Sequence, residues 1–404
     1  MKRTFMTILL VFTIINSFGQ MPTMIDTKES SRINYSNNRV LTMDDMVFAK
    51  TFNPIEKTPL DTTSILIYDY DGSLKSFNLK SKVINWSVKS SGTDREMCGN
   101  KLTLKDGVVY VPFINGEIYA LDNKTGKPFW KLRLGNIKNE IIIKNQIPII
   151  SGGKLYITTQ YQNSNIYALN LKNGELIWNF KLAYPYNHIP ILFFENKIFT
   201  QNAPYFYSFD AETGKPLYQK EFKKAMYGKP VDDAENVFIA NESDILFALS
   251  PDKLDVLWEF HLDEKQYNIK ERIFCKDKKV FIGTYGSDLS SVYSINSKKG
   301  AKIWKTDFKD DKIEYIMEQS NALWGYTEKG LLFQLSLNDG EVIFEKQLMN
   351  LPISNIEFFE NSSIYFFCKR GLVQFNLKSK IEELIYIRDS VKEDATDAFI
   401  KIIR

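Results

Sequence analysis

The stretch Ile118-Tyr-Ala-Leu-Asp-Asn-Lys-Thr-Gly-Lys-Pro-Phe-Trp130 decides the fold, because it recurs along the chain. It returns without gaps as Ile166-Tyr-Ala-Leu-Asn-Leu-Lys-Asn-Gly-Glu-Leu-Ile-Trp178. Eight copies occur, and their last residues lie 40 to 48 residues apart. Such regular self-similarity predicts a repeat architecture. The copies span Leu74–Trp86, Ile118–Trp130, Ile166–Trp178, Phe206–Tyr218, Leu246–Trp258, Val292–Trp304, Leu332–Phe344 and Leu372–Leu384.

The columns of the repeat have physical reasons. The fifth position is Asp, Asn or Ser in every copy, as at Asp122, and such side chains bond the backbone two residues on and start a turn. The ninth position is Gly in five copies, as at Gly126, and Gly permits the positive φ of a tight connection between strands. The last position is Trp in five copies, and we expect it to pack one sheet against the next rather than to stack on a ligand. These are Trp86, Trp130, Trp178, Trp258 and Trp304.

Strand patterns precede the copies of the repeat. Runs such as Val108–Phe113 and Lys154–Thr158 are rich in β-branched and aromatic residues, and shorter extended runs such as Ile147–Ile150 come before them. This amounts to about four short strands per repeat, which is typical of a β-propeller. The sequence therefore predicts an all-β protein, an eight-bladed β-propeller of four-stranded antiparallel blades, over residues 41–390.

Two segments could close the ring of blades. One is Met46–Phe52, which precedes the first full unit, and the other is Ala398–Arg404, at the end of the tail 391–404. We predict that the N-terminal segment adds a strand to the last blade. The tail could instead form a short helix from Asp394.

The N-terminus has the layout of a secretory signal peptide. A basic pair at residues 2–3 precedes a mostly apolar run, Thr4–Ile15, and we expect cleavage after Gly19. The apolar run is shorter than the roughly 20 residues of a membrane span. An uncleaved anchor or a buried strand is the alternative for residues 1–19. Residues 20–40 form a polar N-terminal segment, and no later run predicts a membrane span in the mature chain.

The composition limits the chemistry. The chain has 404 residues, and its 52 basic residues face 49 acidic ones, so bulk charge does not favour nucleic-acid binding. The two histidines, His188 and His261, cannot form a three-His metal site, and we interpret them as ordinary surface or core residues. Cys98, Cys275 and Cys368 are far apart and include no CxxC pair, so they predict no zinc site. We expect at least one of them to be buried and unpaired; which of them are bridged stays open.

The repeat is similar to the PQQ-like propeller repeat, most fully at Ile118–Trp130 and Ile166–Trp178, over about residues 60–388. WD40 units, the alternative of similar length, would show Trp-Asp and Gly-His pairs, and the chain has neither. The resemblance implies one of two branches. Quinoprotein dehydrogenases hold pyrroloquinoline quinone and Ca²⁺ on the propeller axis. The non-catalytic branch resembles the propeller subunit of the outer-membrane β-barrel assembly machinery, which holds partner proteins.

Several features favour the non-catalytic branch. The dehydrogenases are longer, and they commonly carry two adjacent cysteines, whereas Gly99 follows Cys98 here. The stretch Asp69-Tyr-Asp71-Gly-Ser begins like a calcium loop, but Asn78 stands where a Glu ligand should be. We therefore predict a hairpin turn there, with calcium binding as the weaker alternative. No catalytic, cofactor-binding or metal-binding residue and no cofactor is predicted.

The sequence thus predicts an exported, non-enzymatic propeller, a monomer that acts as a protein-binding scaffold in the cell envelope. The expected setting is outer-membrane protein assembly, in the periplasm or associated with the outer membrane. A small-ligand-binding or sensor propeller is the alternative, followed by a PQQ-dependent oxidoreductase. No lipid-anchor Cys follows the apolar run, which departs from the assembly-machinery subunit. The links Lys89–Asn100, Gly135–Ile147 and Ala183–Ile189 are the candidate partner-binding segments.

Overall fold

The computed structural model describes an all-β protein, with no helix among the residues it describes. Within those residues there is accordingly no helix of the length and apolarity that a membrane crossing requires. The described residues are 31–32, 46–50, 63–91, 99–136, 139–160, 164–183, 190–241, 244–263, 266–267, 269, 272–286, 288–360, 362–389 and 397–403.

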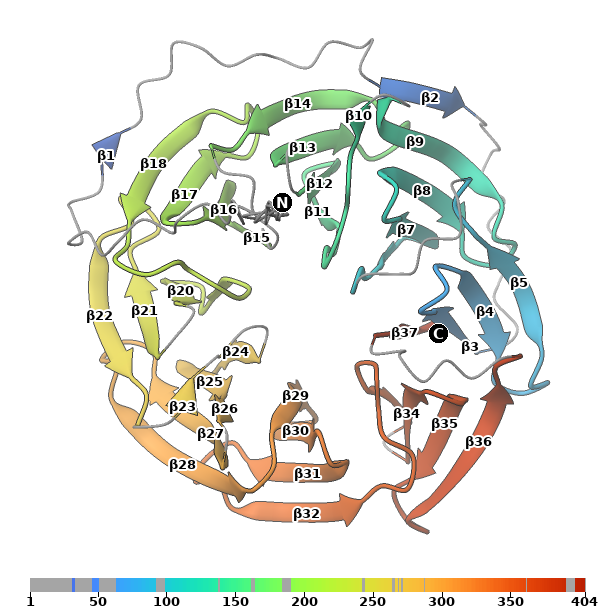
Figure 1. Ribbon diagram of the computed structural model, residues 1–404, viewed down its shortest axis with the longest axis vertical. Helices are drawn as coiled ribbons and strands as arrows, with labels where there is room; N and C mark the ends of the chain where they lie inside the picture. The colour runs from blue at the N-terminus through green and yellow to red at the C-terminus, as the bar shows by residue number, and fades with distance from the viewer. Residues whose placement is uncertain are drawn as a thin grey trace, which may run out of the picture.

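Eight antiparallel sheets stand around a central axis, and each has four strands in order from the axis to the rim (Figure 1). The predicted eight-bladed propeller is confirmed. We number the blades 1 to 8 along the chain and give their strands from the inner to the outer. Blade 1 consists of β37 (Phe399–Ile403), β3 (Ser64–Tyr68), β4 (Leu74–Asn78) and β5 (Ile84–Val88), and blade 2 of β6 (Thr103–Lys105), β7 (Val108–Pro112), β8 (Glu117–Asp122) and β9 (Pro128–Asn136). Blade 3 consists of β11 (Ile149–Ser151), β12 (Lys154–Thr158), β13 (Asn165–Asn170) and β14 (Leu176–Lys181), and blade 4 of β15 (Ile191–Phe194), β16 (Lys197–Asn202), β17 (Tyr205–Asp210) and β18 (Pro216–Glu221). Blade 5 consists of β19 (Val231–Asp232), β20 (Val237–Ala240), β21 (Ile245–Leu249) and β22 (Val256–His261), and blade 6 of β24 (Ile273–Lys276), β25 (Lys279–Gly283), β27 (Leu289–Asn296) and β28 (Lys302–Lys309). Blade 7 consists of β29 (Ile313–Gln319), β30 (Ala322–Thr327), β31 (Leu331–Ser336) and β32 (Val342–Gln347), and blade 8 of β33 (Glu357–Phe359), β34 (Ser363–Cys368), β35 (Gly371–Asn376) and β36 (Ile381–Ile387).

The repeat forms the third and outer strands of each blade and the turn between them. In blade 2 the carboxylate of Asp122 accepts a hydrogen bond from the backbone N–H of Thr125 at 2.7 Å. The N–H of Gly126 donates to the carbonyl of Asp122 at 2.9 Å. The turn predicted from the fifth column is thereby confirmed, and it fixes where each outer strand begins.

Each Trp of the repeat packs on the next blade, as predicted. The indole N–H of Trp130 donates to the carbonyl of Leu171 in blade 3, at 3.1 Å. Its ring lies against Gly174 of the same turn, where a Cβ would come within 2.7 Å of the indole. The same pair of contacts joins Trp86 to blade 2, Trp178 to blade 4, Trp258 to blade 6 and Trp304 to blade 7.

The glycines at the ninth position of the repeat have a different cause from the one predicted. A positive φ occurs there in all eight blades, and in three of them the residue is Lys82, Leu254 or Lys380 instead of Gly. Those three positions follow a blade whose repeat ends in Leu, Tyr or Phe instead of Trp. Contact with the preceding indole is therefore what demands Gly, since that ring occupies the place of a side chain.

The C-terminal strand closes the ring. β37 pairs with β3, with Phe399 opposite Tyr68 and Ile403 opposite Ser64, and Ile400 is fully buried. The prediction that Met46–Phe52 adds a strand to the last blade is wrong. Blade 8 already takes four strands from its own stretch of chain, whereas blade 1 takes only three and needs the tail for its inner strand.

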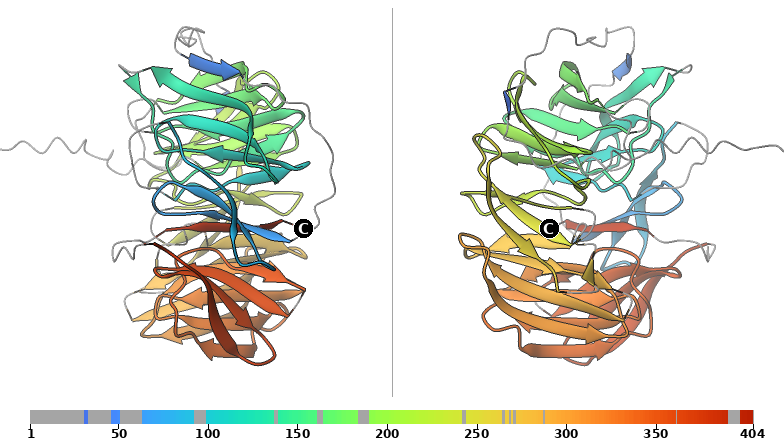
Figure 2. Two further views of the ribbon diagram at one scale, coloured as in Figure 1. Left: turned by 90° about the vertical axis from the view of Figure 1, so that its right-hand side faces the viewer. Right: turned by 60° about the vertical axis from the view of Figure 1, so that its left-hand side comes forward.

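The N-terminal strands lie outside the ring. β2 (Met46–Lys50) adds to the outer edge of β9 in blade 2, and β1 (Ser31–Arg32) adds to the outer edge of β18 in blade 4. Figures 1 and 2 place both on the outer perimeter. The remaining short strands are β10 (Asn139–Glu140), paired with β9, and β23 (Gln266–Tyr267), paired with β26 (Tyr285–Gly286).

Antiparallel pairing gives the ring two distinct faces. The turns of the repeat lie on one face, which we call the motif face. The links between blades and the hairpins between second and third strands lie on the opposite face, which we call the connection face. The described parts of the first two predicted partner-binding links, Lys89–Asn100 and Gly135–Ile147, belong to the connection face, as does Ala183 at the start of the third.

Candidate functional site

The first link of the connection face, Lys89–Asn100, is fixed to the ring at its start. The backbone N–H of Ser91 donates to the carboxylate of Glu117 at 2.7 Å, and the hydroxyl of Tyr119 donates to the same group at 2.6 Å. Burial would raise the pKa of Glu117, but the hydrogen bonds from Ser91 and Tyr119 outweigh it and hold that pKa below its ordinary value. The ionised carboxylate therefore anchors the link. Residues 92–98 lie outside the described part.

The second link, Gly135–Ile147, is tied both to the first link and to blade 3. The amide of Asn100 donates to the carbonyl of Ile143 at 2.9 Å and accepts from the N–H of Gln146 at 3.0 Å. The hydroxyl of Thr158 donates to the side-chain oxygen of Gln146 at 2.6 Å. Because Asn100 and Thr158 are fully buried, these bonds fix the end of the second link, at Ile143 and Gln146, to its neighbours.

The third link, Ala183–Ile189, is described only at Ala183, which is exposed. Residues 184–189, which include His188, lie outside the described part, so the predictions for them are untested.

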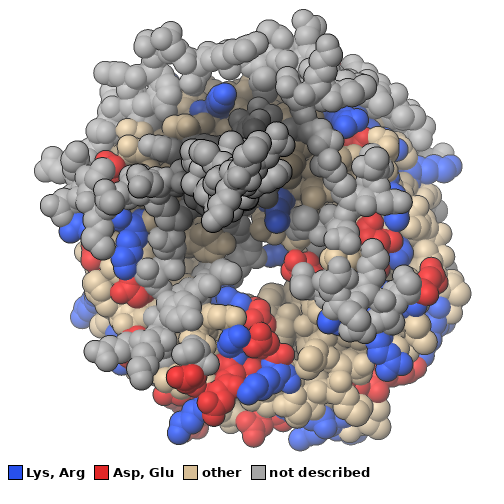
Figure 3. Space-filling view, in the orientation of Figure 1, with Lys and Arg blue, Asp and Glu red and all other residues tan. Residues whose placement is uncertain are grey.

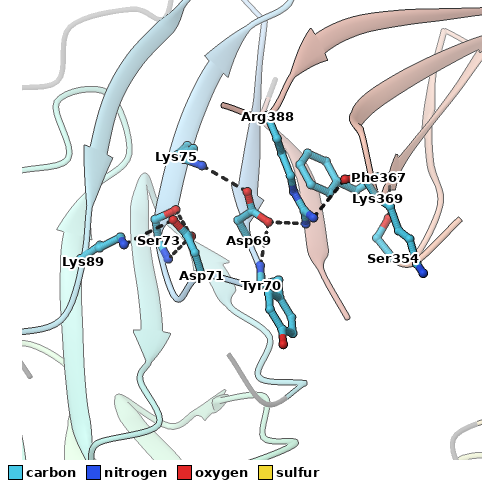
Figure 4. A network of polar contacts seen from close by, with 10 residues as sticks. All are labelled: Asp69, Tyr70, Asp71, Ser73, Lys75, Lys89, Ser354, Phe367, Lys369 and Arg388. Carbon is cyan, nitrogen blue, oxygen red and sulfur yellow. Dashed lines mark hydrogen bonds and ion pairs between the residues drawn. The ribbon is translucent and has the colours of Figure 1, made fainter. Parts of the chain in front are cut away.

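A buried ion pair joins blades 1 and 8 on the connection face (Figure 4). Asp69, directly after β3, contacts the guanidinium of Arg388, directly after β36, and their side chains are 4% and 6% exposed. Lys75 lies 3.1 Å from the other oxygen of Asp69. Arg388 also donates to the carbonyl of Lys369 at 3.2 Å and stacks over Phe367. Both charges are thus paired where the two ends of the chain meet.

The stretch that resembles a calcium loop is a hairpin turn, as predicted. The N–H of Asp69 donates to the carbonyl of Ser73 at 2.8 Å, and the N–H of Gly72 donates to the carbonyl of Asp69 at 3.0 Å. The carboxylate of Asp71 accepts from the N–H of Ser73 at 2.9 Å and pairs with Lys89 at 3.3 Å. Both carboxylates therefore face donors and cations, which does not suit a calcium ligand set.

The remaining candidate side chains are dispersed. His261 is exposed on β22, 3.5 Å from the carboxylate of Glu259, which agrees with the interpretation as an ordinary surface or core residue. Cys368 is buried and free, which confirms the expectation of at least one such thiol. Cys275 is also free and half-buried, and burial raises the pKa of its thiol. Cys98 lies outside the described residues.

Charges of both signs are interspersed on the face drawn in Figure 3, which also shows an opening at the ring axis. Ion pairs between the blades and links include Arg272–Glu314, at 2.9 Å, and Lys312–Glu328, at 3.1 Å. In the portion of the chain that the structure describes, no three His, Cys, Asp or Glu side chains converge as metal ligands.

The sequence profile of the family described as outer membrane protein assembly factor BamB matches residues 38–164 and 162–305. The chain belongs to this family. The predicted resemblance to the non-catalytic propeller of the assembly machinery is thereby confirmed. Comparison with curated proteins finds no match.

Solved structures share the fold at low identity. BamB from Moraxella catarrhalis is 17% identical, with a TM-score of 0.60 over 85% of this chain and 96% of that chain. A europium-containing methanol dehydrogenase is 11% identical, with a TM-score of 0.61 over 76% of this chain and 80% of that one. A quinohemoprotein alcohol dehydrogenase from Comamonas testosteroni is 13% identical, with a TM-score of 0.58 over 82% and 74%. Identities this low establish the propeller fold alone.

The hairpin Asp69–Ser73 does not fit the calcium that the dehydrogenase branch implies. The one stretch that begins like a calcium loop has its carboxylates paired with Arg388, Lys75 and Lys89. The sequence also contains no adjacent pair of cysteines.

Sequence reasoning missed the residues that fix the connection face. Glu117 precedes the second copy of the repeat and Arg388 follows the last, so neither falls in a repeated column. The only signal was a charged side chain beside a strand pattern, and its partner cannot be named before the ring is closed.

Proposed function

We propose that this protein is an exported, non-enzymatic scaffold that binds protein partners in the cell envelope during outer-membrane protein assembly. The family membership carries this proposal. The proposed location is the periplasm, associated with the outer membrane, after removal of residues 1–19.

The connection face is the proposed partner-binding surface. The described ends of two of its links are held by buried polar groups, Glu117 and Asn100, so these ends are formed without a partner. A preformed surface binds with a smaller entropic cost than a flexible one. Loops placed by a rigid frame are also the usual carriers of binding function.

Photo-crosslinking in native envelopes tests this proposal. A photoreactive residue at Lys144 or Ala183, on the connection face, should give adducts with an envelope protein. The same residue at Lys172 or Thr213, on the motif face, is the matched control. Absence of protein adducts from the connection face, or equal adducts from both faces, would contradict the proposal. N-terminal sequencing of the purified envelope form should begin at Gln20.

The enzymatic alternative has its own test. Pyrroloquinoline quinone and Ca²⁺ should leave the absorbance spectrum and the thermal midpoint of the purified protein unchanged. A quinone-dependent shift of the midpoint would favour the oxidoreductase.

A further inference from the structure

The rim of the ring differs between blades at one position of the repeat, the residue just before its last. This residue is Ile177, Leu257, Ile303 or Ile343 in blades 3, 5, 6 and 7, where it is 42% to 58% exposed. In blades 2 and 4 the equivalent residues are Phe129 and Leu217, and both are half-buried. An apolar side chain thus occurs at this position in six blades, and its exposure depends on the blade, whereas blades 1 and 8 carry Asn85 and Glu383.

The two blades with the half-buried residue are the two whose outer edge carries an added strand. β2 runs antiparallel to β9, with Lys50 opposite Trp130, and β1 runs antiparallel to β18, with Arg32 opposite Tyr218. Trp130 and Tyr218 are the same position of the repeat. Each outer strand therefore offers an edge that an extended segment can join, and the chain itself joins two of them.

Blade 7 has the most exposed of these apolar residues, Ile343, at 58%. In the described chain no strand pairs with the outer edge of β32. Met349 and its neighbour Asn350 donate their backbone N–H groups to Glu382 of β36, which brings blade 8 against the end of β32. We call the following five residues the rim patch: Val342 (50% exposed), Ile343 (58%), Met349 (79%), Leu351 (49%) and Ile381 (64%).

An open strand edge beside exposed apolar side chains is a template for strand addition. We propose that the outer edge of β32 binds an extended segment of a partner polypeptide as an added antiparallel strand, over the rim patch. The pairing repeats that of β2 on β9, so the segment would lie along Phe344–Leu348. This inference rests on the proposed protein-binding function and adds a second surface, away from the connection face.

The chemistry of the segment follows from its surroundings. Its apolar side chains would cover Ile343 and Met349, and the sequence of β2, which pairs with the equivalent strand β9, is likewise mostly apolar. Glu341 and Glu345 are exposed and form no ion pair within the described chain, so a basic residue opposite them is favoured. The partner segment is therefore extended, mainly apolar, and carries at least one Lys or Arg.

A peptide-binding experiment tests the proposal on the full mature chain. The probe is a fluorescein-labelled decapeptide that alternates valine with lysine or threonine. The control probe has the same side chains but N-methyl groups at alternate peptide bonds, which removes the N–H groups that pair with a strand edge. We expect fluorescence anisotropy to detect binding of the first probe and not of the second.

Two matched variants locate the binding site. Ile343→Asp should weaken binding of the probe about tenfold, because it places a charge in the covered apolar surface. Leu257→Asp, at the same repeat position of blade 5, should leave binding unchanged. Both residues are largely exposed, so both variants should keep the thermal midpoint of the parent chain.

Three results would overturn the proposal. The first is that the N-methylated probe binds as tightly as the unmodified probe, and the second is that the Ile343→Asp chain binds the unmodified probe as tightly as the parent chain. The third is that no peptide binds while the chain forms a concentration-dependent dimer that Ile343→Asp abolishes, which would make a second copy the occupant. Photo-crosslinking from position Lys144 in the Ile343→Asp chain distinguishes binding at the connection face from binding at the rim patch. If its adducts persist while the probe no longer binds, both proposals stand; if adducts never form but the probe binds, only the connection-face assignment fails.

Discussion

The indole of Trp178 fills the space in which Gly214 of the next blade would carry a side chain. A Cβ at Gly214 would lie 2.5 Å from Cδ2 of the indole, far inside van der Waals contact. The same Trp donates its N–H to the carbonyl of Ala211 in the same turn, at 3.1 Å. Each of the five Trp–Gly pairs thus couples two neighbouring blades, which is why the two residues occur together around the ring.

Replacement of Gly214 by Ala should destabilise the ring by about 2–4 kcal/mol, through overpacking and the cost of a positive φ. Urea denaturation measures this loss. Lys380→Ala is the matched control, because Lys380 holds the same turn position with a φ of 59° and follows a blade without Trp. In a Trp178→Leu background the cost of Gly214→Ala should fall, and equal costs in both backgrounds would contradict the coupling.

Removal of one partner of the buried Asp69–Arg388 pair, between blades 1 and 8, should destabilise the protein. Asp69→Asn or Arg388→Met alone should lower the free energy of unfolding by about 3–5 kcal/mol, because each leaves the other charge buried and less well paired. Lys82→Met removes an exposed ion pair with Glu383 between the same two blades and should lower the free energy of unfolding by less than about 1 kcal/mol. Similar losses from both pairs in urea denaturation would show that burial is not the cause.

The repeat made most of the fold predictable from the sequence. The turn that begins at Asp122 forms within a few residues, and Trp130 packs on the neighbouring blade. Each copy of the repeat therefore contains the residues that specify its own turn and its packing on the next blade. The pairing of Gly with the preceding Trp was also visible in the sequence, since the three copies without Gly follow the three copies without Trp.

Closure and the connection face were not predictable in the same way. Met46–Lys50 and Phe399–Ile403 are both short and apolar, and strand pattern alone does not say which blade lacks an inner strand. The partners Asp69 and Arg388 lie 319 residues apart, and only the closed ring brings them together. Such contacts depend on topology, which a repeat leaves open at its two ends.

Removal of the C-terminal strand should open the ring. A chain that ends at Ala398 lacks β37, so blade 1 loses its inner strand and Ile65 and Ile67 lose their cover. We expect loss of the near-ultraviolet circular dichroism signal and of a single cooperative urea transition. A chain that begins at residue 51 lacks β1 and β2 and should keep both properties. Cooperative unfolding of the tail-deleted chain would mean that the ring closes without β37.

Stability should depend on the protonation of Glu117 in acid. The pKa of Glu117 is held below its ordinary value in the folded chain, by hydrogen bonds that outweigh burial. Its ionised form therefore stabilises the folded state above the unfolded-state pKa of about 4.3, and this contribution is lost as the pH falls through the lower folded-state pKa. The difference in unfolding free energy between the parent chain and Glu117→Gln should accordingly shrink between about pH 6 and pH 3. Glu341→Gln, at an exposed site, is the control, and a difference for Glu117→Gln that stays constant over this range would contradict the anchoring role of the carboxylate.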